Sequence, residues 1–311
     1  MKVCVVVVSY NGMKWIEECL SSILNSSIET TIIVVDNCSK DGTVDYIKTN
    51  FKTVKLLEQK ENLGFGKGNN IGISYALKVK TDYVFLLNQD AFIDKDTISN
   101  LINAAYKNPQ FGILSPIQLN YSGNLLEEYF FNFMAKDKTR SFYSDFVLKN
   151  KLQDIYNIEF VQAASWLIPV AAIMKIGGFD PIFFHYGEDN NYCQRMLYHN
   201  LQIGIVSNAY MRHDANKHNM EQISIFSEKY FILYERNLKV LFANINQEFN
   251  ENNLRYEKRK VYKELFFSIL KLNFTKMRGF SNKLRNFEKT INKILISRKT
   301  NKIINTHYLD D

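Results

Sequence analysis

Polar side chains follow three apolar runs in the first third of the chain, and their types suit the binding of a charged ligand. The first run ends in Ser9-Tyr10-Asn11, the second in Asp36, and the third in Asn88-Gln89-Asp90. The carboxyl ends of parallel strands meet at one edge of a sheet, where ligands bind. Asp36 could accept a hydrogen bond from the N–H of a pyrimidine base, and Asp90 could hold a divalent cation that binds phosphate. The alternative is that these residues only start turns or cap helices.

A second group of candidate residues lies later in the chain, at Glu188-Asp189. Aromatic residues precede this pair, with His185 and Tyr186 just before Gly187. An acid beside an aromatic lip suits sugar binding. The alternative is a helix cap, in which the positive end of the helix favours the charged acids and Glu188 pairs with Arg195 two turns on.

A lone histidine, His213, follows a predicted edge strand at residues 209–212. It is five residues from His218, which is not the i,i+4 spacing of a helical pair of zinc ligands, so we expect no two-histidine zinc site. His213 could still join one Asp around a phosphate-bound cation.

The segment Gly64-Phe65-Gly66-Lys67-Gly68-Asn69-Asn70 is rich in glycine but fits neither common nucleotide-binding fingerprint. The third glycine of a dinucleotide fingerprint would fall at Asn69, and no P-loop Gly-Lys-Ser/Thr follows. We interpret residues 62–70 as a loop before a helix at 71–77. Its backbone N–H groups and Lys67 could approach phosphate, or it could be a plain turn.

The elements that must position these residues alternate between strands and helices. The apolar pattern predicts strands at 3–8, 31–35, 54–57, 83–87, 112–119, 160–168 and 202–206, and helices at 14–25, 41–51, 71–77, 96–107, 170–176 and 188–200. Such alternation predicts an α/β fold with a mostly parallel sheet. Residues 120–159 lack a clear period, so we expect an irregular insertion with a hairpin. Amphipathic patterns at 221–244, 255–272 and 276–297 predict further helices, the last two of them basic.

Composition narrows the class of protein. The 311 residues carry 39 Lys and Arg against 32 Asp and Glu, a net charge of +7, which permits an anionic partner. Four widely spaced cysteines indicate reduced thiols in a cytoplasmic protein rather than a disulfide framework. No run reaches the ~18 apolar residues of a membrane span. The positive charge gathers in the C-terminal region without a recognisable nucleic-acid module, so we expect no nucleic-acid partner.

An ordered set of segments resembles the inverting glycosyltransferases of family 2, within the rhamnosyltransferase-like bacterial branch. The segments are residues 7–11, 34–43, 61–70, 87–90 (Leu87-Asn88-Gln89-Asp90), 177–180 (Gly177-Gly178-Phe179-Asp180) and 183–195, and the resemblance covers roughly residues 1–240. It implies the GT-A fold, a Rossmann-like, mostly parallel central sheet flanked by helices, with a helical C-terminal extension. It also implies a GT-A domain at 1–220, with a nucleotide-binding half at 1–119 and an acceptor-binding half at 120–220. A basic helical region would follow at 221–311.

The resemblance also implies a role for each candidate residue. The metal ligands would be Asp90 and His213, and the catalytic pair would be Asp189, as base, with Glu188. Acceptor contacts would come from Trp166, His185 and Tyr186. The residues that bind the nucleotide would be Ser9, Tyr10, Asn11, Asp36, Asn62, Lys67, Asn88, Gln89 and Asp90. The metal would be Mg²⁺ or Mn²⁺. The first acid of the family's DXD position is the amide Asn88 here, which weakens the expected metal affinity more than it argues against metal use.

The expected function is metal-dependent, inverting sugar transfer from a dTDP- or UDP-linked donor to a hydroxyl of a growing surface glycan. It would proceed by single displacement with an Asp base. Two alternatives are a non-catalytic nucleotide- or carbohydrate-binding protein on the same scaffold and a sugar nucleotidyltransferase. The first would lack the base or metal residues. The second would need a Gly-rich, Arg-containing loop after the first strand, which Ser9-Tyr10-Asn11-Gly12 does not supply.

The expected partners are the nucleotide-diphosphate sugar and an oligosaccharide acceptor, either free or lipid-linked. The basic C-terminal helices are either a solvated face that closes the fold or a peripheral contact with an anionic membrane. We therefore expect a cytoplasmic protein, which in the second case lies on the inner face of the cytoplasmic membrane.

Overall fold

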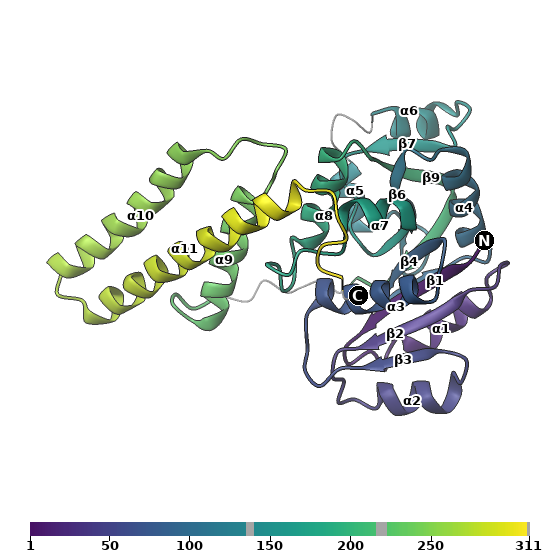
Figure 1. Cartoon of the computed structure of the whole chain (residues 1–311), viewed down its shortest axis with the longest axis horizontal. Helices are drawn as coiled ribbons and strands as arrows, with labels where there is room; N and C mark the ends of the chain where they lie inside the picture. The colour runs from purple at the N-terminus through teal and green to yellow at the C-terminus, as the bar shows by residue number, and fades with distance from the viewer. Residues whose placement is uncertain (135–139, 216–222, 310–311) are drawn as a thin grey trace. The chain divides into compact units, whose positions relative to one another are not determined.

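The computed structural model describes residues 1–134, 140–215 and 223–309. The chain divides into two compact units (Figure 1). The first comprises Met1–Lys217 together with Ile304–Asp311, and the second comprises His218–Ile303. The last residues of the chain therefore belong to the first unit, whereas the sequence predicted one C-terminal region from residue 221 to residue 311.

The first unit begins with parallel strands that alternate with helices. In chain order these are β1 (Val3–Ser9), α1 (Ile16–Leu24), β2 (Thr31–Asp36), α2 (Thr43–Asn50), β3 (Lys55–Glu58), α3 (Phe65–Lys78) and β4 (Tyr83–Asn88). β1 pairs in parallel with β2 and with β4, and β2 pairs in parallel with β3. β-Branched residues dominate β1 and β2 and suit such a buried, pleated surface. The carboxyl ends of β1, β2 and β4 therefore meet at one edge, as predicted.

The second half of the sheet is mixed. Its elements are β5 (Ala91–Ile93), α4 (Thr97–Lys107), β6 (Phe111–Asn120), α5 (Glu128–Met134), α6 (Arg140–Leu148), β7 (Ile155–Ile158), β8 (Ser165–Pro169), α7 (Val170–Ile176), α8 (Glu188–Tyr198) and β9 (Gln202–His213). The strand order is β3-β2-β1-β4-β8-β6-β9-β5, and β7 pairs with β9. β8 runs antiparallel between β4 and β6, with Ser165 opposite Leu87. The residues just before β8 therefore lie beside the carboxyl end of β4.

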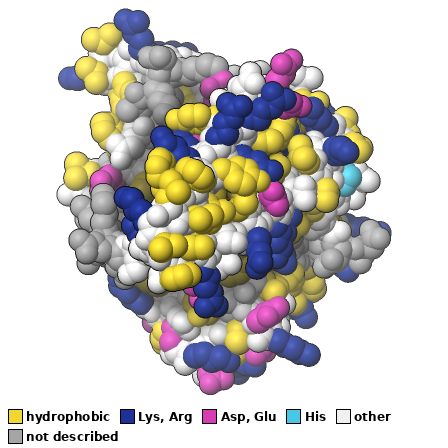
Figure 2. Space-filling model, turned by 90° about the vertical axis from the view of Figure 1, so that its left-hand side faces the viewer, with side chains coloured by type: hydrophobic (Ala, Val, Ile, Leu, Met, Phe, Trp, Pro, Cys, Tyr) yellow, Lys and Arg dark blue, Asp and Glu magenta, His cyan; other side chains and the backbone are white. Residues whose placement is uncertain are grey.

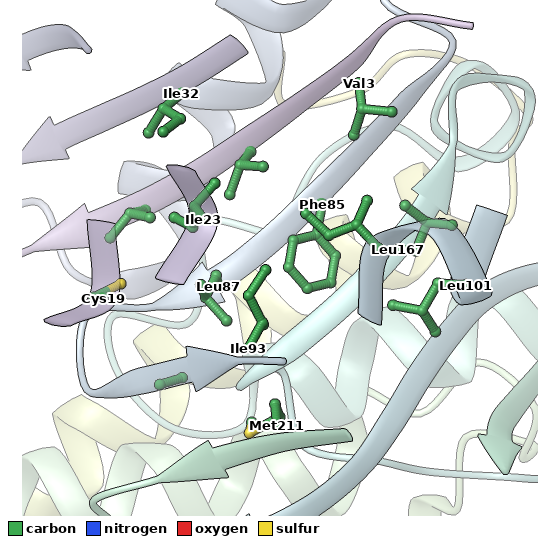
Figure 3. Close-up of a cluster of buried hydrophobic side chains, with 14 of the residues drawn as sticks. Val3, Cys19, Ile23, Ile32, Phe85, Leu87, Ile93, Leu101, Leu167 and Met211 are labelled. Carbon is green, nitrogen blue, oxygen red and sulfur yellow. The ribbon is translucent and has the colours of Figure 1, made fainter. Parts of the chain in front are cut away.

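Apolar side chains cover both faces of the sheet. On β1, Val5 and Val7 belong to one buried cluster and Val6 to the other, because successive side chains of a strand point to opposite faces. Figure 3 shows part of the first cluster, with Phe85 and Leu87 of β4 among side chains from other strands and from α1 and α4. This packing holds the strands in place on both sides, so the polar residues at their ends are held on a rigid support.

The glycine-rich segment is helical rather than a loop, because its glycines pack closely against β1. α3 begins at Phe65. A Cβ added to Gly68 would lie 2.9 Å from Val8 Cγ1, and one added to Gly72 would lie 2.2 Å from Val6 Cγ1. Only glycine permits so close an approach of helix and strand. The predicted loop over residues 62–70 was therefore wrong from residue 65 onward.

Two further elements differ from the sequence expectation. Within its described residues, the segment 120–159 forms α5, α6 and β7, and the antiparallel contact between Leu119 and Leu126 is its only hairpin-like part there. The two predicted strand pieces at 202–206 and 209–212 form one strand, β9, whose pairing with β6 jumps from Val206 to Tyr210. β9 pairs with β6, β5 and β7, so the prediction of an edge strand before His213 was wrong.

The second unit is helical in its described residues. Its helices are α9 (Glu228–Phe242), α10 (Glu251–Leu270) and α11 (Phe274–Asn301), and each begins at a side chain that accepts a backbone N–H, namely Ser227, Asn250 and Asn273. The buried Arg298 of α11 donates to the backbone carbonyls of Phe242 and Gln247, which fixes the connection between α9 and α10. No helix in the described ranges combines the length and the apolar content needed to cross a bilayer.

The residues after α11 pack in the first unit against the connection between α7 and α8. The backbone N–H of Gly178 donates to the carbonyl of His307 at 2.8 Å. Gly177 has φ +77, and a Cβ there would lie 2.2 Å from the same carbonyl oxygen. The guanidinium of Arg195, on α8, lies 5.3 Å from the centre of the Tyr308 ring. The C-terminal segment therefore braces the helix that begins with Glu188-Asp189.

Candidate active site

The side chain of Gln89 joins the ends of β1 and β4. Its Oε1 accepts hydrogen bonds from Ser9 Oγ and from the backbone N–H of Tyr10, each at 3.0 Å, and its Nε2 donates to the carbonyl of Tyr10 at 3.2 Å. Ser9 is buried, whereas Tyr10 is 46% exposed. Gln89 thus holds the loop after β1 and leaves the Tyr10 ring accessible beside the strand ends.

Asp36 ends β2 opposite Ser9 and is buried. Ser39 donates to both of its carboxylate oxygens, through its backbone N–H at 2.9 Å and through its hydroxyl at 2.5 Å. The loop after β1 joins this network, since Asn11 accepts from the backbone N–H of Lys40 at 2.8 Å. A ligand N–H must therefore use a remaining lone pair of Asp36 or displace Ser39.

Asp90 and His213 meet although 123 residues separate them in the chain. Because β5 pairs antiparallel with β9, His213 Nε2 lies 3.3 Å from Asp90 Oδ1. The backbone N–H of Asp214 also donates to the carbonyl of Asp90 at 2.9 Å. Lys14 donates to the Asp214 carboxylate at 2.7 Å and lowers its pKa. This ion pair ties the end of β9 to the segment before α1.

The Asp90–His213 pair offers two ligands of the kinds that divalent cations use. Nowhere in the described ranges do three or more His, Cys, Asp or Glu side chains gather as a metal-binding group. Mg²⁺ and Mn²⁺ usually take several ligands from water and substrate phosphates, so two protein ligands fit a cation that binds together with a diphosphate. His213 Nδ1 is buried without a hydrogen-bond partner among the described residues, whereas Nε2 faces Asp90 Oδ1, an oxygen that accepts a hydrogen bond when the carboxylate is ionised.

The start of α3 joins the end of β2 to the loop before α8. The carbonyl of Gly64 accepts from Asn37 Nδ2 at 3.1 Å, and its N–H donates to Asn62 Oδ1 at 2.9 Å. Gly64 also lies against Phe184, whose carbonyl oxygen would be 2.1 Å from an added Cβ. Lys67 is exposed in the first turn of α3, where helix N–H groups and the dipole attract anions.

Asp189 lies in the first turn of α8, beside the carboxyl end of β4. Its carboxylate takes part in hydrogen bonds with the backbone of Ala163 and with the N–H of Asn190, the latter at 2.7 Å. The carbonyl of the next residue, Ala164, accepts from the backbone N–H of Asn88 at 3.0 Å. The dipeptide Ala163-Ala164 therefore contacts both Asp189 and the strand end that leads to Asp90. Burial raises the pKa of Asp189 above its ordinary value, and the backbone hydrogen bonds oppose this rise.

Arg195 acts differently from the expectation that it pairs with Glu188. Its guanidinium is buried and donates to the backbone carbonyls of Ile176 and Gly178, the latter at 2.6 Å. These carbonyls lie at the end of α7, so Arg195 fixes α8 through the preceding connection. Glu188 is buried near the first turn of α3, where its Cβ lies 3.7 Å from a Cβ added to Gly66.

Trp166 was predicted to contact the acceptor, but the structure places its side chain in the core. Its side chain is fully buried, and its ring stacks on Phe179 with centroids 6.1 Å apart. It lies in the middle of the sheet because β8 pairs with β4 on one side and β6 on the other. The other predicted acceptor residues, His185 and Tyr186, are exposed in the loop before α8, with ring centroids 4.0 Å apart.

Sequence reasoning missed a buried polar cluster next to Ala163. Gln162 Nε2 donates to Gln118 Oε1 and to Glu127 Oε2, both at 2.7 Å. Gln118 and Glu127 are buried, so the cluster fixes the segment that contacts Asp189. The sequence offered one sign of this cluster, because Gln118 and Gln162 are polar residues within two predicted apolar strands. Asn37, which links β2 to Gly64, was also missed although it directly follows Asp36.

A cavity of about 420 Å³ lies elsewhere in the first unit, near the carboxyl end of α3. It is lined by Ser74, Leu77, Lys78, Lys80, Thr81, Val170, Met174, Thr306 and Leu309. None of the predicted site residues lines this cavity. The candidate active site is therefore defined by the contacts at the strand ends and not by this cavity.

The chain resembles known sequences over most of its first unit. Residues 4–219 match the family described as Glycosyl transferase family 2. The chain is 26% identical to the low-salt glycan biosynthesis hexosyltransferase of Haloferax volcanii over 203 residues, which are 64% of this chain and 63% of the relative. The match thus spans slightly less than two thirds of that protein. The chain is also 25% identical over 205 residues to the N-acetylglucosaminyl-diphospho-decaprenol L-rhamnosyltransferase of Mycobacterium tuberculosis, covering 60% and 67% of the two chains.

Solved structures share the fold. TarS of Staphylococcus aureus, in complex with UDP-GlcNAc, superposes with a TM-score of 0.55 at 16% identity and covers 97% of this chain and 91% of its own. The mannosyltransferase PcManGT of Pyrobaculum calidifontis, in complex with GDP-Man and Mn²⁺, gives 0.53 at 18% identity, with 78% and 62% covered. These similarities show the fold alone, and they confirm the predicted GT-A architecture. Because the family match covers more than half of its residues, the chain belongs to glycosyl transferase family 2.

Proposed function

We propose that this chain transfers a sugar from a nucleotide-diphosphate sugar to a hydroxyl of a glycan acceptor, with inversion at the anomeric carbon. The observation that carries the proposal is the contact of Ala163-Ala164 with both Asp189 and Asn88. A half-buried acid then stands next to the strand ends, the position at which α/β sheets bind nucleotides. Membership of glycosyl transferase family 2 supports the reaction class.

The donor would be linked to dTDP or UDP. Thymine and uracil each carry an N–H that can donate a hydrogen bond to a carboxylate. Asp36 is the buried acid among the strand-end loops. Ser9, Tyr10 and Asn11 would shape the site of the base, and the exposed Tyr10 ring offers it an aromatic contact. Asn62, Asn88 and Gln89 would bind other parts of the nucleotide. The diphosphate would lie near Lys67 and the first N–H groups of α3.

Asp90 and His213 would hold Mg²⁺ or Mn²⁺ together with the diphosphate. Their 3.3 Å contact supports this assignment, as does the Mn²⁺ in the structure of the mannosyltransferase from Pyrobaculum calidifontis. When bound, such a cation neutralises the charge that develops on the departing diphosphate.

Asp189 would act as the general base. The acceptor oxygen attacks the anomeric carbon while its proton passes to Asp189, and the bond from that carbon to the diphosphate oxygen breaks with its electron pair leaving on the diphosphate. A single displacement of this kind inverts the configuration. The pKa raised by burial makes Asp189 a stronger base than an exposed Asp. Glu188 would support the start of α8, and His185 and Tyr186 would contact the acceptor.

The acceptor would be a growing surface glycan on a lipid carrier. One relative is named as a rhamnosyltransferase of N-acetylglucosaminyl-diphospho-decaprenol, which is a lipid-linked sugar, and another is named for low-salt glycan biosynthesis. With such an acceptor, the sugar would be transferred at a membrane surface. We propose the inner face of the cytoplasmic membrane, with the basic C-terminal helices as the peripheral contact.

The Asp189→Asn variant tests the proposed base. We expect turnover, measured as nucleoside diphosphate released, to fall about 10²- to 10⁴-fold, because proton removal from the acceptor is lost. Calorimetric binding of UDP or dTDP with Mn²⁺ should stay near the wild-type value. Asp45→Asn, an exposed change on α2, is the matched control and should leave both quantities unchanged. Turnover of Asp189→Asn close to that of the wild type would show that another group is the base.

A further inference from the structure

The connection between α10 and α11 exposes a dense group of large apolar side chains. They are Phe266, Phe267, Ile269, Leu270, Leu272 and Phe274. Their exposed fractions range from 46% for Ile269 to 75% for Phe274. A soluble surface rarely leaves so many neighbouring large apolar residues in water, and such patches mark interaction sites. We call these six residues the apolar tip.

Positive charge surrounds the apolar tip. Residues 265–287 contain five Lys and Arg and no Asp or Glu. Of these, Lys271, Lys276 and Arg278 are exposed next to the tip. Figure 2 faces this end of the helical unit and shows hydrophobic side chains gathered together with Lys and Arg around them. A long basic side chain can bury its apolar stem and keep its charge at a polar boundary.

The backbone N–H groups of residues 271–273 all have hydrogen-bond partners within the connection. The N–H of Lys271 donates to the carbonyl of Phe267, that of Leu272 to Ile269, and that of Asn273 to Ser268. The Asn273 side chain then caps α11 by accepting from the N–H of Lys276 at 3.0 Å. These polar groups would lose no partner on leaving water, which is the condition that a lipid environment imposes on a backbone.

We infer that the apolar tip inserts into the interfacial layer of an anionic lipid bilayer, with the surrounding Lys and Arg on the lipid headgroups. A second copy of the chain is a weaker candidate for this surface, because a symmetric contact would bring one basic rim against another. A nucleic acid would use the charge but leave the apolar side chains in water. This inference rests on the peripheral membrane contact of the proposed function and names the residues that make it, and it can be tested separately from sugar transfer.

Vesicle flotation of the full chain tests the insertion. With vesicles of phosphatidylcholine containing about 30% phosphatidylglycerol, we expect the wild type to float, and with pure phosphatidylcholine we expect clearly weaker binding. The double variant Leu272→Ser/Phe274→Ser should bind at least about tenfold more weakly, because two large apolar side chains no longer leave water. Lys271→Gln and Lys276→Gln should each weaken binding about fivefold. Ile296→Ser, which removes an exposed apolar residue of α11 away from the tip, is the matched control.

Circular dichroism and unchanged turnover on a soluble acceptor would show that the variants are folded. Equal flotation of the wild type and Leu272→Ser/Phe274→Ser would overturn the inference, as would equal binding to neutral and anionic vesicles. A wild type that does not float, but forms dimers that the tip variant abolishes, would assign the surface to a second copy. Failure of sugar transfer in every protein, with normal flotation, would instead count against the proposed function.

Discussion

Gly64 packs closely against the loop before α8, and replacing it by alanine should disturb the whole candidate active site. Its φ is +81 and its ψ is 176, a conformation that essentially only glycine adopts. A Cβ would lie 2.1 Å from the carbonyl oxygen of Phe184. That atom belongs to a backbone, so it cannot turn away like a flexible side chain. Gly64→Ala must therefore move either α3 or the loop that leads to Asp189.

The expected loss of stability has two parts. The backbone conformation costs an alanine about 1–3 kcal/mol, and the overlap with Phe184 costs about 1–3 kcal/mol more. We therefore expect Gly64→Ala to lower the free energy of unfolding by about 2–6 kcal/mol. Gly42 separates the two parts, because it also precedes a helix at φ +91 but has no atom within 4 Å of an added Cβ. Gly42→Ala should lose only about 1–2 kcal/mol.

Urea unfolding followed by tryptophan fluorescence measures this difference in the relevant part of the chain. The two tryptophans, Trp15 and Trp166, both lie in the first unit, so the signal does not report on the helical unit. Turnover should fall further in Gly64→Ala than in Gly42→Ala, because only the former displaces the loop before Asp189. Equal losses of stability in the two variants, within about 0.5 kcal/mol, would refute the close contact between Gly64 and Phe184.

The other predictions concern single side chains. Trp166→Ala should lower the free energy of unfolding by about 3–5 kcal/mol, because it empties a fully buried site. An unchanged unfolding curve together with a higher KM for the acceptor would restore Trp166 to the acceptor site. Asp90→Ala should weaken Mn²⁺-dependent binding of UDP in calorimetry, and an unchanged titration would remove Asp90 from the metal site. The turnover of the wild type should rise with pH through a pKa above the ordinary value of 3.8, because burial raises the pKa of Asp189 and only its ionised form accepts a proton. The same raised pKa means that Asp189 stabilises the fold at low pH and that this contribution is lost as pH rises, so Asp189→Asn should be at least as stable as the wild type at pH 7.

The outline of the first unit could be predicted from the sequence because its signals are local. β-Branched runs located β1 and β2, and an apolar and aromatic run located β4. The parallel order of these strands brought Ser9, Asp36 and Asn88 to one edge. The end of α7 was also predicted, because many helices end at a residue with positive φ and glycine adopts this conformation easily, as Gly177 does here. These signals depend on neighbours in the chain, so they can be read without coordinates.

The partners of the site residues could not be predicted in the same way. Arg195 binds the carbonyls at the end of α7 rather than Glu188, since helical spacing says nothing about a neighbouring element. Trp166 resembled a sugar-binding residue in the sequence, but the antiparallel insertion of β8 between β4 and β6 buries it. The glycines of α3 are read as a loop by propensity, yet their contact with β1 stabilises a helix there.

The sequence alone therefore determined which strand ends carry acids and amides. The alternation of strands and helices, the buried apolar runs and the turns between them are all patterns of consecutive residues. Only the tertiary structure decided that Ala163-Ala164 connects Asp189 with the end of β4, that Asp90 faces His213, and that the C-terminal segment returns to brace α8. The physical reason is that such contacts join residues far apart in the chain. They form when whole elements pack, and no local pattern of residue types encodes which distant surfaces will meet.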